Sequence, residues 1–187
     1  MPSLATKLVD RFLRARDLRQ ITYYLVPGMK ILAMGRGQDW LLGRSGVAGP
    51  GSLGLDPALT AEVTTPPGHR RRPWRPEKGV PSDAGMFDAV VTVGRFDDPA
   101  GLADGVSGIL RADGLLIVVV ESRASVWIRN VGFVFRRLAG MPCPPPARPE
   151  RPDHVFFLPR FRLLRYVHCR LWSRELLVFE RTGSIPS

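Results

Sequence analysis

One stretch of sequence decides the fold: Lys30-Ile31-Leu32-Ala33-Met34-Gly35-Arg36-Gly37-Gln38-Asp39. Its first half is a short apolar run between glycines, which is typical of a buried strand, and its second half is a glycine-rich turn. Residues 40–42 then favour the start of a helix, and residues 52–55 form a second short run that ends in Asp56. The stretch therefore predicts a unit of strand, glycine turn, short helix, strand and acidic residue.

Strands and helices continue to alternate downstream. Residues 87–93 are rich in β-branched residues and predict a strand. Asp98 is a good N-cap, and Pro99 suits the first position of a helix that reaches about residue 111. A turn at residues 112–114 leads into the apolar strand 115–120. This alternation predicts a doubly wound, Rossmann-like α/β fold with a mainly parallel sheet and helices on both faces.

The two ends of the sequence add further elements. Apolar residues at spacings of three and four predict an amphipathic helix over residues 4–25. Near the C-terminus, strands over residues 166–172 and 175–181 are expected to form an antiparallel hairpin around a tight turn at residues 173–174. We expect an N-terminal helix within residues 1–26 and one domain over residues 27–187, which act as a single domain overall.

Other stretches carry weaker signals. Residues 57–86 read mostly as an exposed loop, with a short helix or strand within residues 59–64 as an open alternative. Residues 125–139 favour a helix, residues 142–152 are too rich in proline for one, and a short helix is expected near residues 159–165. No internal repeat is visible.

Composition limits the class of protein. The chain has 187 residues, with 27 Lys and Arg against 17 Asp and Glu. Its apolar share of 44% fits a globular protein, and no apolar run approaches the roughly 18 residues of a transmembrane helix. The charged first 20 residues lack an apolar segment, so we expect no secretory signal, and Cys143 and Cys169 match no disulfide framework or metal-binding spacing. These observations predict a basic, soluble, cytoplasmic protein without a metal site.

The glycine turn is the main feature with chemical meaning. Glycines at 35 and 37 allow a tight bend and let a ligand approach the backbone, while the following helix offers unpaired N–H groups. An acidic residue at the end of the next strand is placed to accept hydrogen bonds from ribose hydroxyls. Asp56 is at that position, so the sequence predicts a site for a nucleoside-containing ligand. The alternative is a structural turn and an ordinary loop carboxylate.

The order of these segments resembles the class I S-adenosylmethionine-dependent methyltransferases, especially the small bacterial ones, over about residues 20–181. The segments that carry the resemblance are Val26-Pro27-Gly28-Met29-Lys30-Ile31-Leu32, Gly35-Arg36-Gly37, Gly54-Leu55-Asp56, Val80-Pro81, Gly85-Met86-Phe87-Asp88-Ala89-Val90-Val91, Ile109-Leu110-Arg111-Ala112-Asp113-Gly114-Leu115-Leu116-Ile117 and His154-Val155-Phe156-Phe157-Leu158-Pro159. The resemblance implies S-adenosyl-L-methionine as cofactor. The residues implied to bind it are Gly35, Arg36, Gly37, Asp39, Asp56, Glu77 and Val93, with Asp83 as an alternative to Glu77.

The sequence departs from the family pattern at three positions. Ala33 replaces an acidic residue before the glycine turn, Asp39 replaces its third glycine, and Asp113 replaces a glycine before the fifth strand. These changes leave the fold intact. The missing carboxylate at position 33 removes one charge-assisted hydrogen bond, worth about 1.5–3 kcal/mol. Weak cofactor binding, or none, is therefore one expectation.

Few residues stand out as catalytic. Methyl transfer from a sulfonium depends on proximity and in-line orientation, and needs a general base only if the acceptor must lose a proton. His154 is the candidate for that base, with Glu121 and His168 as further candidates. Asp88 reads as structural, and neither cysteine reads as a nucleophile.

Three functions follow from this reading. The first is a methyltransferase acting on a small-molecule or lipid-like acceptor. The second is a catalytically degenerate binding or partner protein, which the residues at 33 and 39 would explain. The third is an RNA-directed enzyme that uses the basic segment 69–78, where Trp74 could stack on bases. Segment 127–137 could instead contact an anionic membrane surface or close over an apolar substrate. The alternative for this segment is a helix that packs against the sheet. The high arginine content has an alternative explanation too, which is a surface of arginines exposed to solvent.

Overall fold

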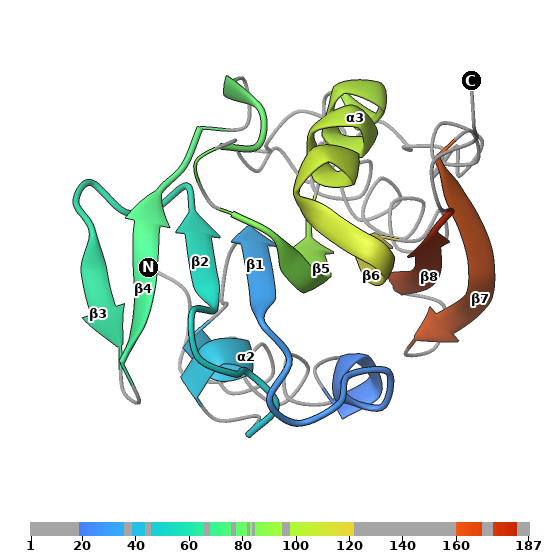
Figure 1. Ribbon diagram of the computed structural model, residues 1–187, viewed down its shortest axis with the longest axis horizontal. Helices are drawn as coiled ribbons and strands as arrows, with labels where there is room; N and C mark the ends of the chain where they lie inside the picture. The colour runs from blue at the N-terminus through green and yellow to red at the C-terminus, as the bar shows by residue number, and fades with distance from the viewer. Residues whose placement is uncertain are drawn as a thin grey trace, which may run out of the picture.

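An eight-stranded sheet runs through the centre of the molecule in this computed structural model (Figure 1). The structure describes residues 19–35, 39–43, 46–65, 68–75, 78–81, 83, 85–94, 98–121, 160–169 and 174–182. The elements are β1 (Ile31–Gly35), α2 (Asp39–Gly43), β2 (Leu53–Asp56), β3 (Val63–Thr65), β4 (His69–Pro73), β5 (Phe87–Val93), α3 (Pro99–Ile109), β6 (Leu110–Glu121), β7 (Phe161–Cys169) and β8 (Arg174–Arg181).

The strand order is β3-β4-β2-β1-β5-β6-β8-β7. The five strands from β4 to β6 in this order are parallel. The outer β3 pairs antiparallel with β4, and β8 runs antiparallel to both of its neighbours. The predicted doubly wound, mainly parallel sheet with a C-terminal antiparallel hairpin is therefore confirmed. Because β1 lies between β2 and β5, the order of the strands reverses at this central point.

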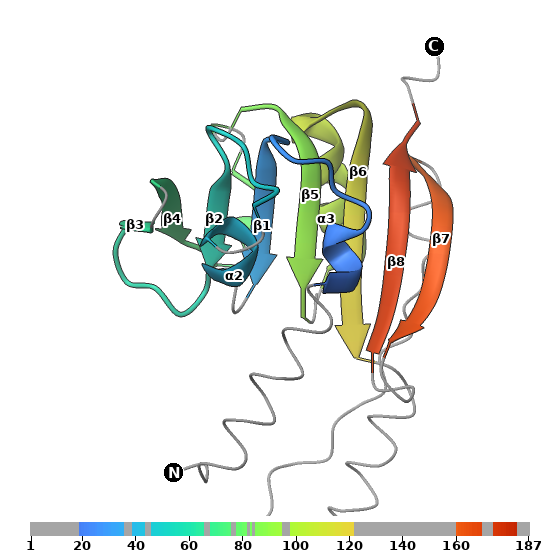
Figure 2. The same cartoon turned by 90° about the horizontal axis from the view of Figure 1, so that it is seen from below.

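Helices cover both faces of the sheet, as the sequence predicts (Figure 2). On one face, α3 packs through residues such as Leu102 and Val106 against Leu116 and Phe179. On the other face, α2 and the helical turn at residues 19–22 pack against a second apolar cluster that includes Ile31. All five residues of β1 are buried, which explains why the sequence there is a continuous apolar run and does not alternate.

Asp88 joins the amino-terminal ends of the central strands. Its Oδ2 accepts a hydrogen bond from the backbone N–H of Lys30 at 2.8 Å, and its Oδ1 lies 2.5 Å from a guanidinium nitrogen of Arg111. These contacts link β5 to the residue before β1 and to β6. Asp88 is therefore structural, as its sequence context indicates. At the start of α3, Asp98 caps the helix by accepting from the backbone N–H of Gly101 at 2.9 Å.

The exposed loop expected over residues 57–86 is wrong in part, because this segment contains β3 and β4. The strand β4 is parallel to β2 and extends the sheet by one position. It was missed because its sequence, His69-Arg70-Arg71-Arg72-Pro73, carries polar side chains at the buried positions as well as at the exposed ones. A search for apolar alternation cannot detect such a strand.

Three local expectations near the later strands also need correction. The short helix expected near residues 159–165 is wrong, because Phe161 already begins β7 and pairs with Arg181 of β8. Arg174 is the first residue of β8 and not part of a turn. The turn at residues 112–114 lies within the bounds of β6, where Asp113 has a φ of +59° and the pairing with β5 shifts. Asp113 thus tolerates the left-handed conformation for which glycine is usual.

Several expectations lie outside the described residues. Of the helix expected over residues 4–25, residues 19–25 are described. Residues 19–22 are helical, but residues 23–25 are not, and Tyr24 and Leu25 instead donate to the carbonyl oxygens three residues before them, so the expected C-terminal end of the helix is wrong. The segments 125–139 and 142–152 also lie outside. Among the helices that the structure describes, none is long and apolar enough to span a membrane.

Candidate functional site at the carboxyl edge of the sheet

Three of the predicted site residues lie along one edge of the sheet. Gly35, Asp56 and Val93 end the neighbouring parallel strands β1, β2 and β5. This is also where the strand order reverses. In open α/β sheets, ligands bind outside the carboxyl ends of the strands at such a reversal. The fold therefore brings these residues to the place where a ligand is expected.

Gly35 is held in place by the sheet itself. Its φ is +104°, a conformation that residues with a side chain rarely adopt. A Cβ atom added to it would lie 2.2 Å from the backbone oxygen of Val93, its partner in β5. The sequence correctly marks this glycine as constrained, but the constraint that the structure shows is close packing between two strands.

Asp56 is buried at the end of β2, with 5% of its surface exposed. Its Oδ1 accepts a hydrogen bond from the backbone N–H of Ala58 at 2.8 Å. Its Oδ2 forms an ion pair with the guanidinium group of Arg71. An ionised carboxylate can accept about four hydrogen bonds. These two contacts fix the orientation of the Asp56 carboxylate and leave acceptor positions for a ligand.

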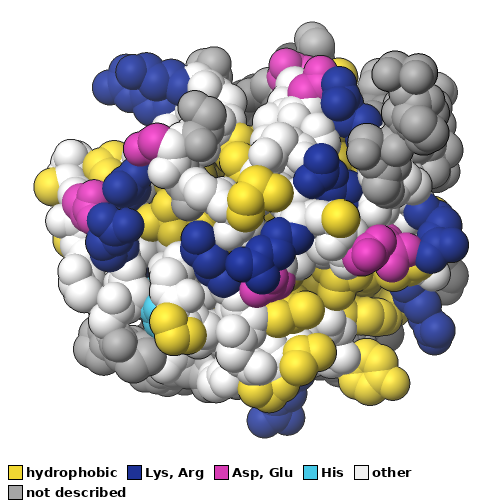
Figure 3. Space-filling model, viewed as in Figure 1, with side chains coloured by type: hydrophobic (Ala, Val, Ile, Leu, Met, Phe, Trp, Pro, Cys, Tyr) yellow, Lys and Arg dark blue, Asp and Glu magenta, His cyan; other side chains and the backbone are white. Residues whose placement is uncertain are grey.

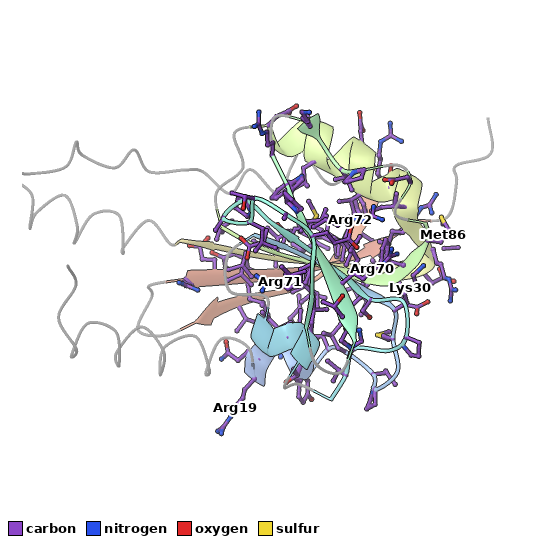
Figure 4. All side chains as sticks on the ribbon, turned by 90° about the vertical axis from the view of Figure 1, so that its left-hand side faces the viewer. Arg19, Lys30, Arg70, Arg71, Arg72 and Met86 are labelled. Carbon is purple, nitrogen blue, oxygen red and sulfur yellow. The ribbon has the colours of Figure 1, made fainter. Side chains whose placement is uncertain are left out.

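Arg71 reaches Asp56 from the adjacent strand. In the register of β2 and β4, Arg71 lies opposite Gly54, two residues before Asp56. Alternate residues of a strand share a face, so Arg71, Gly54 and Asp56 lie on the same side of the sheet. Gly54 has no side chain, which leaves room beside it for the arginine. Figure 4 shows this end of the sheet with Arg70, Arg71 and Arg72 labelled on β4.

The sequence does not reveal the ion pair between Asp56 and Arg71, because it depends on recognising β4. The one available signal is the alternation itself. His69 and Arg71 are buried, whereas Arg70 between them is exposed. A strand in which every second residue is buried, but in which the buried residues are polar, is easily mistaken for an unstructured basic segment.

Glu175 is a second residue that sequence reasoning missed. It lies near the start of β8, opposite Val120 of β6 and His168 of β7. Because β8 is antiparallel, its beginning lies at the same edge as the carboxyl ends of the parallel strands. Glu175 is 6% exposed, and its Oε2 has no hydrogen-bond partner in the described part of the chain. Charged residues are rarely buried to this extent without a partner.

Several predicted site residues cannot be placed. Arg36, Gly37, Glu77 and His154 lie outside the described residues. For three others only the backbone is described: Asp39 begins α2, Glu121 ends β6 and His168 lies in β7. The roles that the resemblance implies for these residues stay predictions.

The basic segment does not form the exposed aromatic platform that RNA stacking would need. Trp74 is buried, and its Nε1 donates to the carbonyl oxygen of Gly79 at 2.9 Å. Arg72 pairs with Glu62 at 3.2 Å and with Asp83 at 3.1 Å. Asp83, the predicted alternative to Glu77 as a cofactor-binding residue, thus forms an ion pair with an arginine. Figure 3 shows basic side chains spread over this face of the molecule, several beside acidic ones.

We expect Trp74→Phe to lower the free energy of unfolding by about 1–2 kcal/mol, because the carbonyl of Gly79 loses its donor and the smaller ring leaves a gap. Urea denaturation measures this effect. The control Val26→Ala, at a side chain that is 60% exposed, should change stability by less than about 0.5 kcal/mol. If Trp74→Phe instead weakened RNA binding and left stability unchanged, our assignment of Trp74 to the core would be wrong.

Comparison with known proteins gives structural matches only. Neither a family model nor a curated protein matches the sequence. An S-adenosylmethionine-dependent methyltransferase from Mesorhizobium loti matches with a TM-score of 0.61 and 16% identity, over 88% of this chain and 96% of its own. The N-methyltransferase NodS from Bradyrhizobium japonicum matches with a TM-score of 0.61 and 11% identity, over 94% and 99%.

A third match is magnesium protoporphyrin IX methyltransferase from Synechocystis, whose structure contains S-adenosylhomocysteine (SAH). Its TM-score is 0.60 and its identity 12%, over 97% of this chain and 89% of its own. All three cover nearly the whole chain. The protein has the methyltransferase fold.

The residues at the carboxyl edge would fit one part of an S-adenosylmethionine molecule. The carboxylate of Asp56 suits a ribose diol, because it retains acceptor capacity and is held by two donors. Ala33 is buried in the apolar cluster beneath α2, so no carboxylate from this position meets the ammonium group of the cofactor. The described residues therefore fit the nucleoside half of the cofactor better than the amino-acid half.

Proposed function

We propose that this protein is an S-adenosylmethionine-dependent methyltransferase that acts on a small-molecule or lipid-like acceptor. The observation that carries the proposal is the position of Asp56. It places an oriented carboxylate at the end of β2, next to the strand that ends in Gly35, where the strand order reverses. The fold and the match to a structure that contains SAH support the same reading.

In this proposal each described residue has a limited task. Asp56 accepts hydrogen bonds from the ribose hydroxyls, and Gly35 keeps the end of β1 free of a side chain. The cofactor, when bound, supplies an activated methyl group, so the protein must chiefly bind and orient the two reactants. Where the acceptor must lose a proton, His154 remains the predicted base. Glu175 is a further candidate, because its buried carboxylate lies at the carboxyl edge of the sheet, as Asp56 does.

Calorimetric titration with SAH tests the cofactor assignment. We expect binding in the micromolar range, which corresponds to about −8 kcal/mol. NAD serves as the control ligand, because it also contains adenosine and also binds sheets of this kind. Absence of SAH binding up to millimolar concentration, with a folded protein by circular dichroism, would refute the enzyme and favour a non-catalytic role.

The acceptor class is tested by transfer of a labelled methyl group from S-adenosylmethionine. The substrates to compare are a small-molecule extract, lipid vesicles and protein-free RNA. We expect label in the small molecules or the lipid. The burial of Trp74 and the pairing of Arg72 with two carboxylates argue against RNA. Label in the RNA fraction would contradict this part of the proposal.

A further inference from the structure

We propose that Arg71 is a positioning residue for nucleoside recognition, and that it holds the Asp56 carboxylate in the state that accepts the ribose hydroxyls. The inference rests on the proposed function, because it assumes a ribose at Asp56. It adds a residue from β4, a strand that the sequence does not reveal.

The first argument is burial. The side chains of Arg71 and Asp56 are 10% and 7% exposed, so neither charge is well solvated. Burying a carboxylate without a cation beside it is costly, and such a group turns toward water where it can. That movement would take the Asp56 oxygens away from the edge where Gly35 and Val93 end their strands. Arg71 holds the carboxylate in place by pairing with Oδ2.

The second argument is orientation. Arg71 binds Oδ2 and the backbone N–H of Ala58 binds Oδ1, so each oxygen has one fixed partner. Two donors on different oxygens define the plane of the carboxylate. The remaining lone pairs, one or more on each oxygen, match the two hydroxyls of a ribose. A single donor would leave the group free to rotate.

The third argument is the difference between neighbouring arginines. Arg70 is adjacent in sequence, but its side chain is 61% exposed and lies 3.8 Å from Glu62. Arg72 pairs with Glu62 and Asp83. Of the three arginines on β4, Arg71 is the one that pairs with Asp56 at the carboxyl edge. Arg70 therefore offers a matched control with the same change in net charge.

The experiment compares the affinities of SAH and its 2′-deoxy analogue. The dissociation constant of the 2′-deoxy analogue divided by that of SAH gives a ratio that measures how much the 2′-hydroxyl contributes to binding. Hydrogen bonds to a charged acceptor predict a ratio of about 10 to 100 in the wild-type protein. We expect Arg71→Met to bring the ratio near 1, and Arg71→Lys, which keeps the charge but not the planar fork, to lower it at least about threefold. Arg70→Met should leave it unchanged.

The ratio separates positioning from mere support of the fold. A purely structural arginine would lower stability and weaken both ligands equally, which leaves the ratio intact and overturns the proposal. Should Arg71→Met fail to fold, the Arg71→Lys variant carries the test alone.

Three further outcomes are distinguishable. If the wild-type protein binds SAH with a ratio near 1, the positioning role is wrong while the proposed function stands. If it binds neither ligand, the proposed function fails and this inference fails with it. Stronger SAH binding in Arg71→Met would show that Arg71 blocks Asp56, which also overturns the proposal.

Discussion

Replacing Gly35 with alanine is expected to lower the free energy of unfolding by about 3–5 kcal/mol, a large share of the roughly 5–15 kcal/mol of a typical domain. The added Cβ would lie 2.2 Å from the backbone oxygen of Val93, and the backbone φ of +104° adds strain of its own. The obstructing atom belongs to a central strand, which cannot shift without disturbing its pairing with β6. Urea denaturation followed by circular dichroism measures the loss.

A glycine in the helix α3 provides the control. A Cβ added to Gly108 meets no atom within 4 Å, and the residue lies inside the helix. Gly108→Ala should therefore raise stability, by about 0.5–1 kcal/mol. If Gly35→Ala were as stable as the wild-type protein, the close approach of β1 and β5 described above would be incorrect.

The second large effect concerns the ion pair between Asp56 and Arg71. Each single substitution, Asp56→Leu or Arg71→Met, removes one partner of a buried ion pair and should cost about 3–5 kcal/mol. The double variant removes both charges together. It should recover most of that loss, because apolar side chains of similar size often replace a buried ion pair at little cost. Equilibrium unfolding of the four proteins gives the interaction energy directly.

A substitution at an exposed arginine serves as the control for the buried ion pair. Arg70→Met should change stability by less than about 0.5 kcal/mol, because its side chain is exposed and lies 3.8 Å from the carboxylate of Glu62. Additive losses in the double variant at positions 56 and 71 would mean that the two side chains do not support each other.

The sequence predicts the centre of the sheet well and its margins poorly, for a physical reason. β1, β2, β5 and β6 are buried on both sides, so their apolar runs are distinctive. β4 pairs with β2 but carries His69, Arg71 and other polar residues, so its pattern resembles that of a loop. At the other margin, β7 contains Arg162 and Arg165, and two of its apolar residues, Leu164 and Tyr166, are exposed. Strands with little apolar burial are specified by pairing, which local pattern cannot show.

The candidate site divides in the same way. Gly35 and Asp56 follow recognisable strands, so their positions at the carboxyl edge could be predicted from the order of segments. Arg71 and Glu175 depend on which strands become neighbours, and that is a property of the whole fold. The sequence also predicts which residue is important more readily than the physical reason for its importance. Gly35 is required by Val93 across the sheet, in addition to any need to admit a ligand.

The order of the strands also has a consequence for how the protein is made. β8 lies between β6 and β7, although it follows both in the chain. Until residues 174–181 have left the ribosome, the N–H and C=O groups along the free edge of β6 have no strand to pair with, and they belong to the apolar run 115–120. An unpaired apolar edge is a site of aggregation. The nascent chain is therefore most vulnerable between the synthesis of β6 and that of β8, and a product that stops before Arg174 would be a target for cellular quality control.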